Sequence, residues 1–321
     1  MFDTRRIGAT EMRTTRLGFG CSGIGNLQTV VRETDAQAVL ERAWEAGIRY
    51  FDTAPHYGRG RSEARLGRFL KGHDGAVIST KVGRVLTPGS ARDAADGFVD
   101  PLPHDVHYDY SGDGLRRSLD GSRQRLGRDF IDIVYVHDIG RLTHGGDHAR
   151  HLRDLLDTGL PALATMKAEG RIGAYGLGVN ECDICLEVMS HADLDAILLA
   201  GRWTLLDRSA ETELVPLCRA RGTSLVLGGI FNSGILATGS KPGAWFDYAP
   251  ATDDILDAVT RLQGRAEGMG MTLPQAAMQF ALTRPEVASV LIGTGRTASL
   301  NRNLDAIAAP VPGAAADLFG D

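Results

Sequence analysis

The sequence predicts a single α/β domain folded as a closed (β/α)8 TIM barrel. Eight short runs rich in apolar residues alternate with helical patterns along the 321-residue chain. Most of these runs are continuous in apolar residues, which is typical of parallel strands buried on both faces. No change of composition divides the chain, and such barrels usually take about 250 residues plus insertions. We therefore expect residues 1–321 to form one domain.

Apolar runs and helical periodicity locate the individual elements. In the first helix, Ala36, Val39 and Leu40 recur at helical spacing and Gly47 ends the pattern. The expected strands are 16–20, 49–51, 77–81, 130–137, 174–179, 195–200, 224–228 and 289–293. The expected helices are 35–47, 61–70, 115–127, 152–169, about 180–191 and 211–221.

Three segments stand outside this repeat. Residues 6–15 are expected to form a small hairpin before the first barrel strand. Two long segments, 83–111 and 229–251, follow strand ends, so both should be loops at the carboxyl-end face of the barrel. That face carries the active site in such barrels, and long loops there usually shape a binding site.

Composition excludes several classes of function. A formal net charge of -5 argues against a nucleic-acid or anionic-membrane partner. No apolar run reaches the roughly 18 residues of a membrane span, and the first residues lack the apolar core of a signal peptide. Four cysteines in so long a chain do not suggest a disulfide scaffold, so we expect free thiols and a cytoplasmic protein.

Polar side chains follow the ends of three consecutive expected strands. They are Asp52, Tyr57 just beyond it, Lys81 and His137. Strand ends converge in a barrel, so a lysine beside a carboxylate would stay charged and would lower the tyrosine pKa from about 10. Such a tyrosine can donate or remove a proton, and a nearby histidine can orient the same oxygen. The alternative is a structural ion pair beside a core histidine.

Three motifs resemble the aldo-keto reductases. They are residues 51–58 (FDTAPHYG), 79–83 (STKVG) and 136–138 (VHD). The resemblance covers nearly the whole chain. It is closest to the branch of sugar dehydrogenases that includes D-threo-aldose 1-dehydrogenase, L-fucose dehydrogenase and L-galactose dehydrogenase, with pyridoxal 4-dehydrogenase a near relative.

The resemblance implies a catalytic tetrad and a nicotinamide cofactor. Tyr57 would be the general acid or base, Lys81 paired to Asp52 would tune it, and His137 would position the reacting oxygen. Trp203 would stack on the nicotinamide, so the implied substrate contacts are Tyr57, His137 and Trp203. The implied cofactor contacts are Gly20, Asn180, Trp203, Gly228, Gly229, Phe231, Asn232, Ser233, Gly293, Thr294, Arg296, Ser299 and Asn303.

Two departures from the family pattern bear on the cofactor. Gly293 and Ser299 stand where NADP-preferring members often carry a lysine and an arginine, and Arg296 is the only cation that we expect nearby. A 2′-phosphate without an arginine partner loses charge-assisted hydrogen bonds. We therefore expect NAD, or use of both cofactors. Glu181 stands where many relatives carry an amide, which weakens the case for a carboxamide contact at Asn180.

Two further motifs are interpreted structurally. Gly18, Gly20 and Gly23 match G-x-G-x-x-G, but about ten more residues precede the next helix, so we expect close backbone approach rather than a Rossmann fold. Cys182 and Cys185 form a C-x-x-C pair without a second pair to complete a zinc site, so we expect no metal.

Several other polar and aromatic residues have no assigned chemistry. The histidines at 144, 148 and 151 are expected in a solvated loop. Other side chains could line the substrate site or lie in a plain loop; they are Cys21, His104, His107, Tyr108, Tyr110, Phe246 and Tyr248.

The prediction is an NAD(P)-dependent enzyme that oxidises the anomeric carbon of a free aldose to a lactone. A broad-specificity NADPH-dependent aldehyde or ketone reductase, a pyridoxal 4-dehydrogenase, a cofactor-sensing regulatory subunit and an unrelated barrel enzyme stay open as alternatives. The sequence predicts a small-molecule substrate and gives no oligomeric state.

Overall fold

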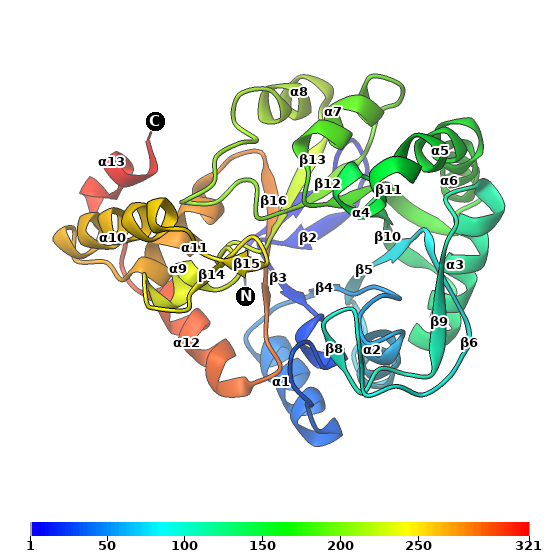
Figure 1. Ribbon diagram of the computed structural model, residues 1–321, viewed down its shortest axis with the longest axis horizontal. Helices are drawn as coiled ribbons and strands as arrows, with labels where there is room; N and C mark the ends of the chain where they lie inside the picture. The colour runs from blue at the N-terminus through cyan, green and yellow to red at the C-terminus, as the bar shows by residue number, and fades with distance from the viewer. Residues whose placement is uncertain (1, 321) are drawn as a thin grey trace.

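Eight parallel strands form a closed barrel in the computed structural model, which describes residues 2–320 apart from the side chains of 314, 316 and 317. Each strand pairs with its neighbours around the ring, and helices surround it (Figure 1). This confirms the predicted fold, with every strand within a few residues of its expected place. The barrel strands are β3 (Leu17–Gly20), β4 (Tyr50–Asp52), β5 (Val77–Val82), β10 (Ile131–His137), β11 (Ile172–Val179), β12 (Ala196–Ala200), β13 (Ser224–Gly228) and β16 (Val287–Gly293).

The amino-terminal end of the barrel is closed by a hairpin of β1 (Thr4–Arg6) and β2 (Arg13–Thr15). Ile7, in the turn between them, is fully buried in a cluster with Tyr50 and Tyr135. Burying such a side chain contributes about 1.5–3 kcal/mol. The hydroxyls of Tyr50 and Tyr135 lie 3.2 Å apart in the interior of the barrel. The hairpin therefore packs, through Ile7, against side chains of the barrel interior.

The expected helices are present, and end signals account for their bounds. The Ser111 hydroxyl accepts a hydrogen bond from the Gly114 amide, and Gly127 ends the same helix with a φ of 64°. No helix of the described residues is long and apolar enough to cross a membrane. The helices that match expectation are α1 (Glu33–Glu45), α2 (Arg61–Leu70), α3 (Gly112–Leu126), α5 (His148–Asp154), α6 (Leu160–Ala168), α7 (Cys182–Met189) and α8 (Leu214–Arg221), with a π-helical turn, Leu155–Gly159, between α5 and α6.

The two long segments, 83–111 and 229–251, were expected to be loops, but both contain regular secondary structure. The first contains two small antiparallel sheets and the second another, with a short helix. In Figure 1 the β6–β9 ribbon lies beside α3, away from β14 and β15. The elements of these segments are β6 (Arg84–Pro88), β7 (Ala94–Ala95), β8 (Phe98–Val99), β9 (His104–Tyr108), α9 (Ile235–Thr238), β14 (Trp245–Phe246) and β15 (Ala249–Pro250).

Besides α9, five helices of the described residues were not predicted, and three of them are long. α10 (Asp253–Gly268) buries only Val259 and Ala266, so its apolar stripe is thin. α11 (Leu273–Thr283) is buried nearly all round, so no amphipathic pattern marks it. The others are α12 (Thr297–Ala308) and the short α4 (Arg141–His144) and α13 (Ala316–Phe319).

Gly83, directly after β5, is a test of the local geometry. Its φ is +103°, and a Cβ there would lie 2.4 Å from the ring of Tyr110. We expect Gly83→Ala to lower the free energy of unfolding by about 2–4 kcal/mol, because left-handed strain and overpacking add. Urea denaturation would measure this. Gly170→Ala is the matched control, since Gly170 also has a positive φ but nothing within 4 Å of its Cβ.

Candidate active site

Three of the four predicted catalytic side chains share one hydrogen-bond network. The Lys81 ammonium donates to the Asp52 carboxylate at 2.6 Å, to the carbonyl of Thr53 at 3.0 Å and to the Tyr57 hydroxyl at 3.1 Å. Its nitrogen also lies 4.7 Å from the centre of the Tyr57 ring. A cation is thus held against the tyrosine on one side and a carboxylate on the other.

Strand register brings these residues together. Asp52 ends β4 and pairs with Ser79 of β5, whose hydroxyl donates to the Asp52 carboxylate at 2.6 Å. Side chains alternate along a strand, so Lys81 follows Ser79 on the same face. Lys81 in turn pairs with Tyr135 of β10, two residues before His137. Tyr57 follows in the turn after β4, where its amide donates to Ala54 at 3.1 Å.

Burial sets the charges of this network. Asp52 and Lys81 are each 2% exposed. Burial alone would lower the pKa of Lys81, but Asp52 and Tyr57 hold it above its ordinary value, so the ammonium stays protonated. Burial raises the pKa of Tyr57 to about 12, although the charge of Lys81 lowers it. The expected net lowering is therefore wrong: the cation acts in the predicted direction, but desolvation is the larger effect.

His137 ends β10 beside Tyr57, with their ring centres 6.1 Å apart. Burial, with the charges of Arg84 and Lys81, lowers its pKa well below the ordinary value, so the imidazole is neutral. Its Nε2 lies 3.4 Å from Asp138, and its Nδ1 is buried without a hydrogen-bond partner among the described residues. A neutral ring with an unpaired nitrogen fits a group that contacts a bound ligand.

Four further residues around the tetrad were not predicted from the sequence; they are His56, Arg84, Phe98 and Asp138. Arg84, at the start of β6, donates to the Nδ1 atom of His56 at 2.9 Å and to Asp138 at 2.6 Å. The Phe98 ring lies 5.9 Å from that of Tyr57. His56 and Asp138 could have been identified, because each is a polar residue next to a tetrad residue in the sequence. Nothing in the sequence indicates that Arg84 reaches both.

The expected cofactor residues lie on the other side of the same barrel mouth. They follow β11, β12, β13, β16 and β3, which are consecutive in the barrel, whereas the tetrad comes from β4, β5 and β10. A Cβ on Gly20 would make ordinary contacts, at 3.8 Å or more, with the neighbouring strand β16. A Cβ on Gly23 would lie 2.6 Å from the backbone of Thr294, so close loop packing explains this glycine.

Several of these side chains are already bound within the protein. Trp203 is 3% exposed, and its indole N–H donates to Glu211 at 2.9 Å. The Asn232 amide donates to Gly201 at 3.1 Å and its oxygen accepts from Thr204 at 2.6 Å. These contacts tie the loops after β12 and β13 together. Cofactor contact through these side chains stays a prediction.

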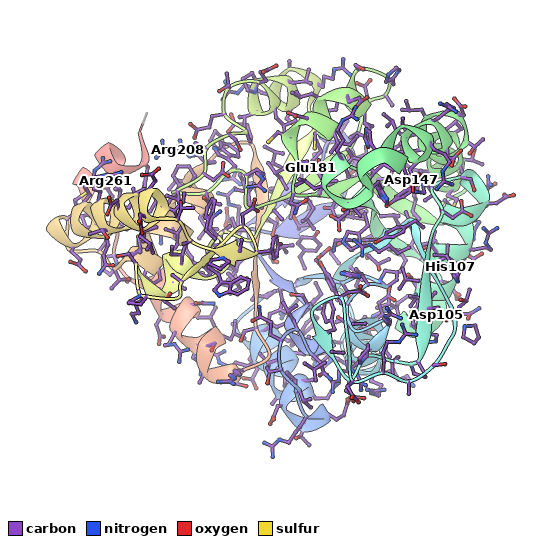
Figure 2. All side chains as sticks on the ribbon, viewed as in Figure 1. Asp105, His107, Asp147, Glu181, Arg208 and Arg261 are labelled. Atoms are coloured by element: carbon purple, nitrogen blue, oxygen red, sulfur yellow. The ribbon has the colours of Figure 1, made fainter. Side chains whose placement is uncertain are left out.

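Asn180 and Glu181 follow β11. No side-chain hydrogen bond of Asn180 to the described residues is present, and its carbonyl accepts from Arg202 at 2.7 Å. The Glu181 carboxylate accepts from the Leu142 amide at 3.2 Å and so binds the segment after β10 (Figure 2). Glu181 therefore has a structural partner of its own, and Asn180 keeps its amide free for a ligand.

The segment after β16 holds a second cation that we had not expected. Arg302 donates to the Ser299 hydroxyl at 3.0 Å. The expectation that Arg296 is the only nearby cation is therefore wrong, because α12 places residue 302 one turn beyond residue 299. Arg296 caps the same helix, and its amide donates to the Thr294 hydroxyl at 3.1 Å.

The solvated-loop prediction for the three histidines is wrong. His148 and His151 are 1% and 4% exposed and lie in α5. His144 lies 2.8 Å from the hydroxyl of Tyr110, which donates to the backbone oxygen of His137 at 2.8 Å. Tyr110 is fully buried and supports the backbone of His137 through this hydrogen bond.

In the described part of the chain, the other candidate residues of the long segments form no hydrogen bond with Asp52, Tyr57, Lys81 or His137. His104 binds the carbonyl of Arg59, and His107 lies at the outer edge of the ribbon (Figure 2). Tyr108 is 41% exposed, and Phe246 and Tyr248 lie around the β14–β15 turn, with Tyr248 72% exposed.

The cysteines are unpaired, and Cys21 is fully buried. Burial raises the pKa of Cys21, Cys182 and Cys185, which disfavours reactive thiolates. Among residues 2–320, no group of three or more histidine, cysteine or acidic side chains is arranged to hold a metal ion.

Comparison with known proteins decides the family. The profile of the aldo/keto reductase family matches residues 16–315. This chain is an aldo/keto reductase. Pyridoxal 4-dehydrogenase of Microbacterium luteolum is 43% identical over 94% of this chain and 92% of its own length. D-threo-aldose 1-dehydrogenase of a Pseudomonas species is 40% identical over 95% and 92%.

Structural comparison agrees. The holo form of aldo-keto reductase AKR11C1 from Bacillus halodurans superposes with a TM-score of 0.77 at 25% identity, over 99% of this chain and 95% of its own. This aldo/keto reductase is therefore an oxidoreductase, and nicotinamide cofactors are typical of its family. The unpaired His137 nitrogen fits a ligand bound across the mouth.

Proposed function

We propose that the protein is an NAD(P)-dependent dehydrogenase that oxidises the anomeric carbon of a free aldose to a lactone. The observation that carries this proposal is the contact of Lys81 with both Asp52 and the Tyr57 hydroxyl, beside a neutral His137. The similarity to a D-threo-aldose 1-dehydrogenase supports a sugar substrate.

The residues divide the chemistry as follows. Tyr57, as the phenolate, accepts the proton of the C1 hydroxyl while C1 loses a hydride and its C–O bond becomes C=O. The hydrogen bond from Lys81 stabilises the phenolate, and an N–H of neutral His137 orients the same oxygen. A nicotinamide cofactor, when bound, would supply the acceptor for this hydride. Asp52, Tyr57, Lys81 and His137 are the proposed catalytic residues.

We propose NAD as the preferred cofactor. Gly293 has no side chain to meet a 2′-phosphate, and Ser299 is uncharged. Arg302, bound to Ser299, is the residue through which NADP would also be used. The proposed contacts remain the residues expected from the sequence at the ends of β11, β12, β13, β16 and β3.

Pyridoxal is the second candidate substrate, favoured by the similarity to a pyridoxal 4-dehydrogenase. Aldoses and pyridoxal share a reactive form: in each, an aldehyde and a hydroxyl of the same molecule close to a cyclic hemiacetal. Loss of hydride from that carbon gives a lactone in both cases. One arrangement of Tyr57, Lys81 and His137 would serve either substrate.

We further infer that the chain works as one domain in the cytoplasm on a small molecule. The closed barrel uses strands from residue 17 to residue 293, and the cysteines are unpaired, which suits a reducing compartment.

The direction of the reaction should show in its pH dependence. With the pKa of Tyr57 raised to about 12, little phenolate is present at neutral pH. We expect kcat/KM for oxidation to rise about tenfold per pH unit from about 7 to 10, and that for reduction, which uses the protonated form, to stay flat. Initial rates in both directions measure this. A flat oxidative profile would contradict the assignment of Tyr57.

A substrate and cofactor panel tests the proposed function. Absorbance at 340 nm would be followed with NAD or NADP against L-fucose, L-galactose, D-arabinose, other aldoses and pyridoxal. Simple aldehydes would be run in reverse with NADH and NADPH. Reduced cofactor formed with an aldose supports the proposal, and formation with pyridoxal alone selects the second candidate. Aldehyde reduction by NADPH, with no activity on any sugar, overturns both the sugar and the NAD proposals.

A further inference from the structure

His56 lies beside the catalytic tyrosine and histidine but takes no part in the tetrad. Its ring centre is 6.3 Å from that of Tyr57, 5.7 Å from that of His137 and 5.4 Å from that of Phe98. The residue follows β4 and is partly exposed. A polar group that proton transfer does not need therefore borders both residues that handle the reacting oxygen.

Arg84 fixes which nitrogen of His56 carries the proton. Nη1 of Arg84 lies 2.9 Å from Nδ1 of His56. A guanidinium can only donate, so Nδ1 must accept. Burial and the charge of Arg84 lower the pKa of His56 to about 3, so the ring is neutral and its single proton is on Nε2. That N–H has no partner among the described residues.

The arginine that holds this tautomer is itself held firmly. Arg84 is 7% exposed, and its second nitrogen donates to Asp138 at 2.6 Å. The ring of Tyr108 lies over its guanidinium, with the carbon 5.3 Å from the ring centre. The Nε2–H of His56 is thus oriented before any substrate arrives, which reduces the entropic cost of using it.

We propose that His56 donates this hydrogen bond to a hydroxyl oxygen on the carbon next to the reacting carbon. In the proposed function Tyr57 and His137 contact the reacting oxygen, so a donor whose ring adjoins both of theirs can reach the substituent on the neighbouring carbon. His56 is then a specificity-determining residue for 2-hydroxy carbonyl compounds, the class to which aldoses belong. The inference rests on the proposed function and narrows its substrate class.

A site built to bind a hydroxyl discriminates strongly against an analogue without it, because its own donor is left unpaired. We expect wild-type kcat/KM to favour lactaldehyde over propanal by about 10- to 100-fold in reduction. The same ratio should hold for an aldose over its 2-deoxy counterpart in oxidation.

Two variants of His56 test this. His56→Leu removes the donor, and we expect the lactaldehyde-to-propanal ratio to fall to within about threefold of unity while propanal turnover persists. His56→Gln keeps an N–H donor and should retain part of the preference. An unchanged ratio in His56→Leu would overturn the proposal.

A second measurement separates this inference from the proposed function. ¹⁵N NMR of the ligand-free protein should show the His56 proton on Nε2, and this tautomer should no longer be enforced in Arg84→Met. A proton on Nδ1 in the wild type overturns the inference whatever the substrate. If no sugar is oxidised but lactaldehyde is still preferred over propanal, the aldose proposal alone is overturned and the role of His56 is supported.

Discussion

Replacing Tyr57 by phenylalanine should reduce turnover by about 10²- to 10⁴-fold while dinucleotide binding stays nearly intact. The Tyr57 hydroxyl is the oxygen that Lys81 contacts at 3.1 Å, and phenylalanine keeps the ring while removing only that oxygen. The 4.7 Å contact between the Lys81 ammonium and the ring can persist, so we expect the pocket to keep its shape. Steady-state kinetics and a fluorescence titration of the cofactor would be measured on the same preparation.

Tyr175→Phe is the matched control. Tyr175 is also a barrel tyrosine, but it lies on β11 near Lys167, with its ring 5.7 Å from that ammonium and away from the tetrad. This variant should keep full activity. Should Tyr57→Phe retain more than about a tenth of wild-type kcat, another group must transfer the proton. Loss of cofactor binding together with activity would instead indicate a damaged pocket.

Much of the barrel was predictable because its signals are local. Each strand is a short apolar run, and end signals such as Gly127 fix where helices stop. The strands of segments 83–111 and 229–251 were not predictable, because their residues are mostly half-buried or exposed and show no alternation. α10 and α11 were missed for opposite reasons: one buries too little of its surface to show a stripe, the other nearly all of it.

That Asp52, Tyr57, Lys81 and His137 lie close together was predictable from sequence, whereas their surroundings were not. Strand ends in a barrel converge, so Asp52, Lys81 and His137 had to meet. Arg84 belongs to an insertion whose path no local pattern specifies, and its partner Asp138 is 54 positions away in sequence. The pKa of Tyr57 depends on how completely the fold excludes water, which is a property of packing rather than of residue types.

Removing the ammonium of Lys81 should damage stability as well as activity. Lys81→Met leaves the Asp52 carboxylate buried with Ser79 as its remaining side-chain donor. Breaking a buried ion pair on one side costs about 3–5 kcal/mol, because the other charge stays uncompensated. Activity should fall too, since the Tyr57 phenolate loses its stabilising cation. Lys167→Met is the matched control. Lys167 forms an ion pair with Asp195, but its side chain is 34% exposed, so this variant should lose about 1 kcal/mol or less of the free energy of unfolding.

The double variant Asp52→Asn/Lys81→Met distinguishes a structural from a catalytic role for the pair. It removes both charges, so the free energy of unfolding should recover most of what Lys81→Met loses, since replacing a buried pair by neutral groups is often close to neutral. Activity should not recover, because no cation faces Tyr57. Urea denaturation and steady-state kinetics on the three proteins measure the two effects separately. Recovery of both stability and turnover would mean that Asp52 and Lys81 are a structural ion pair and that Tyr57 acts without them.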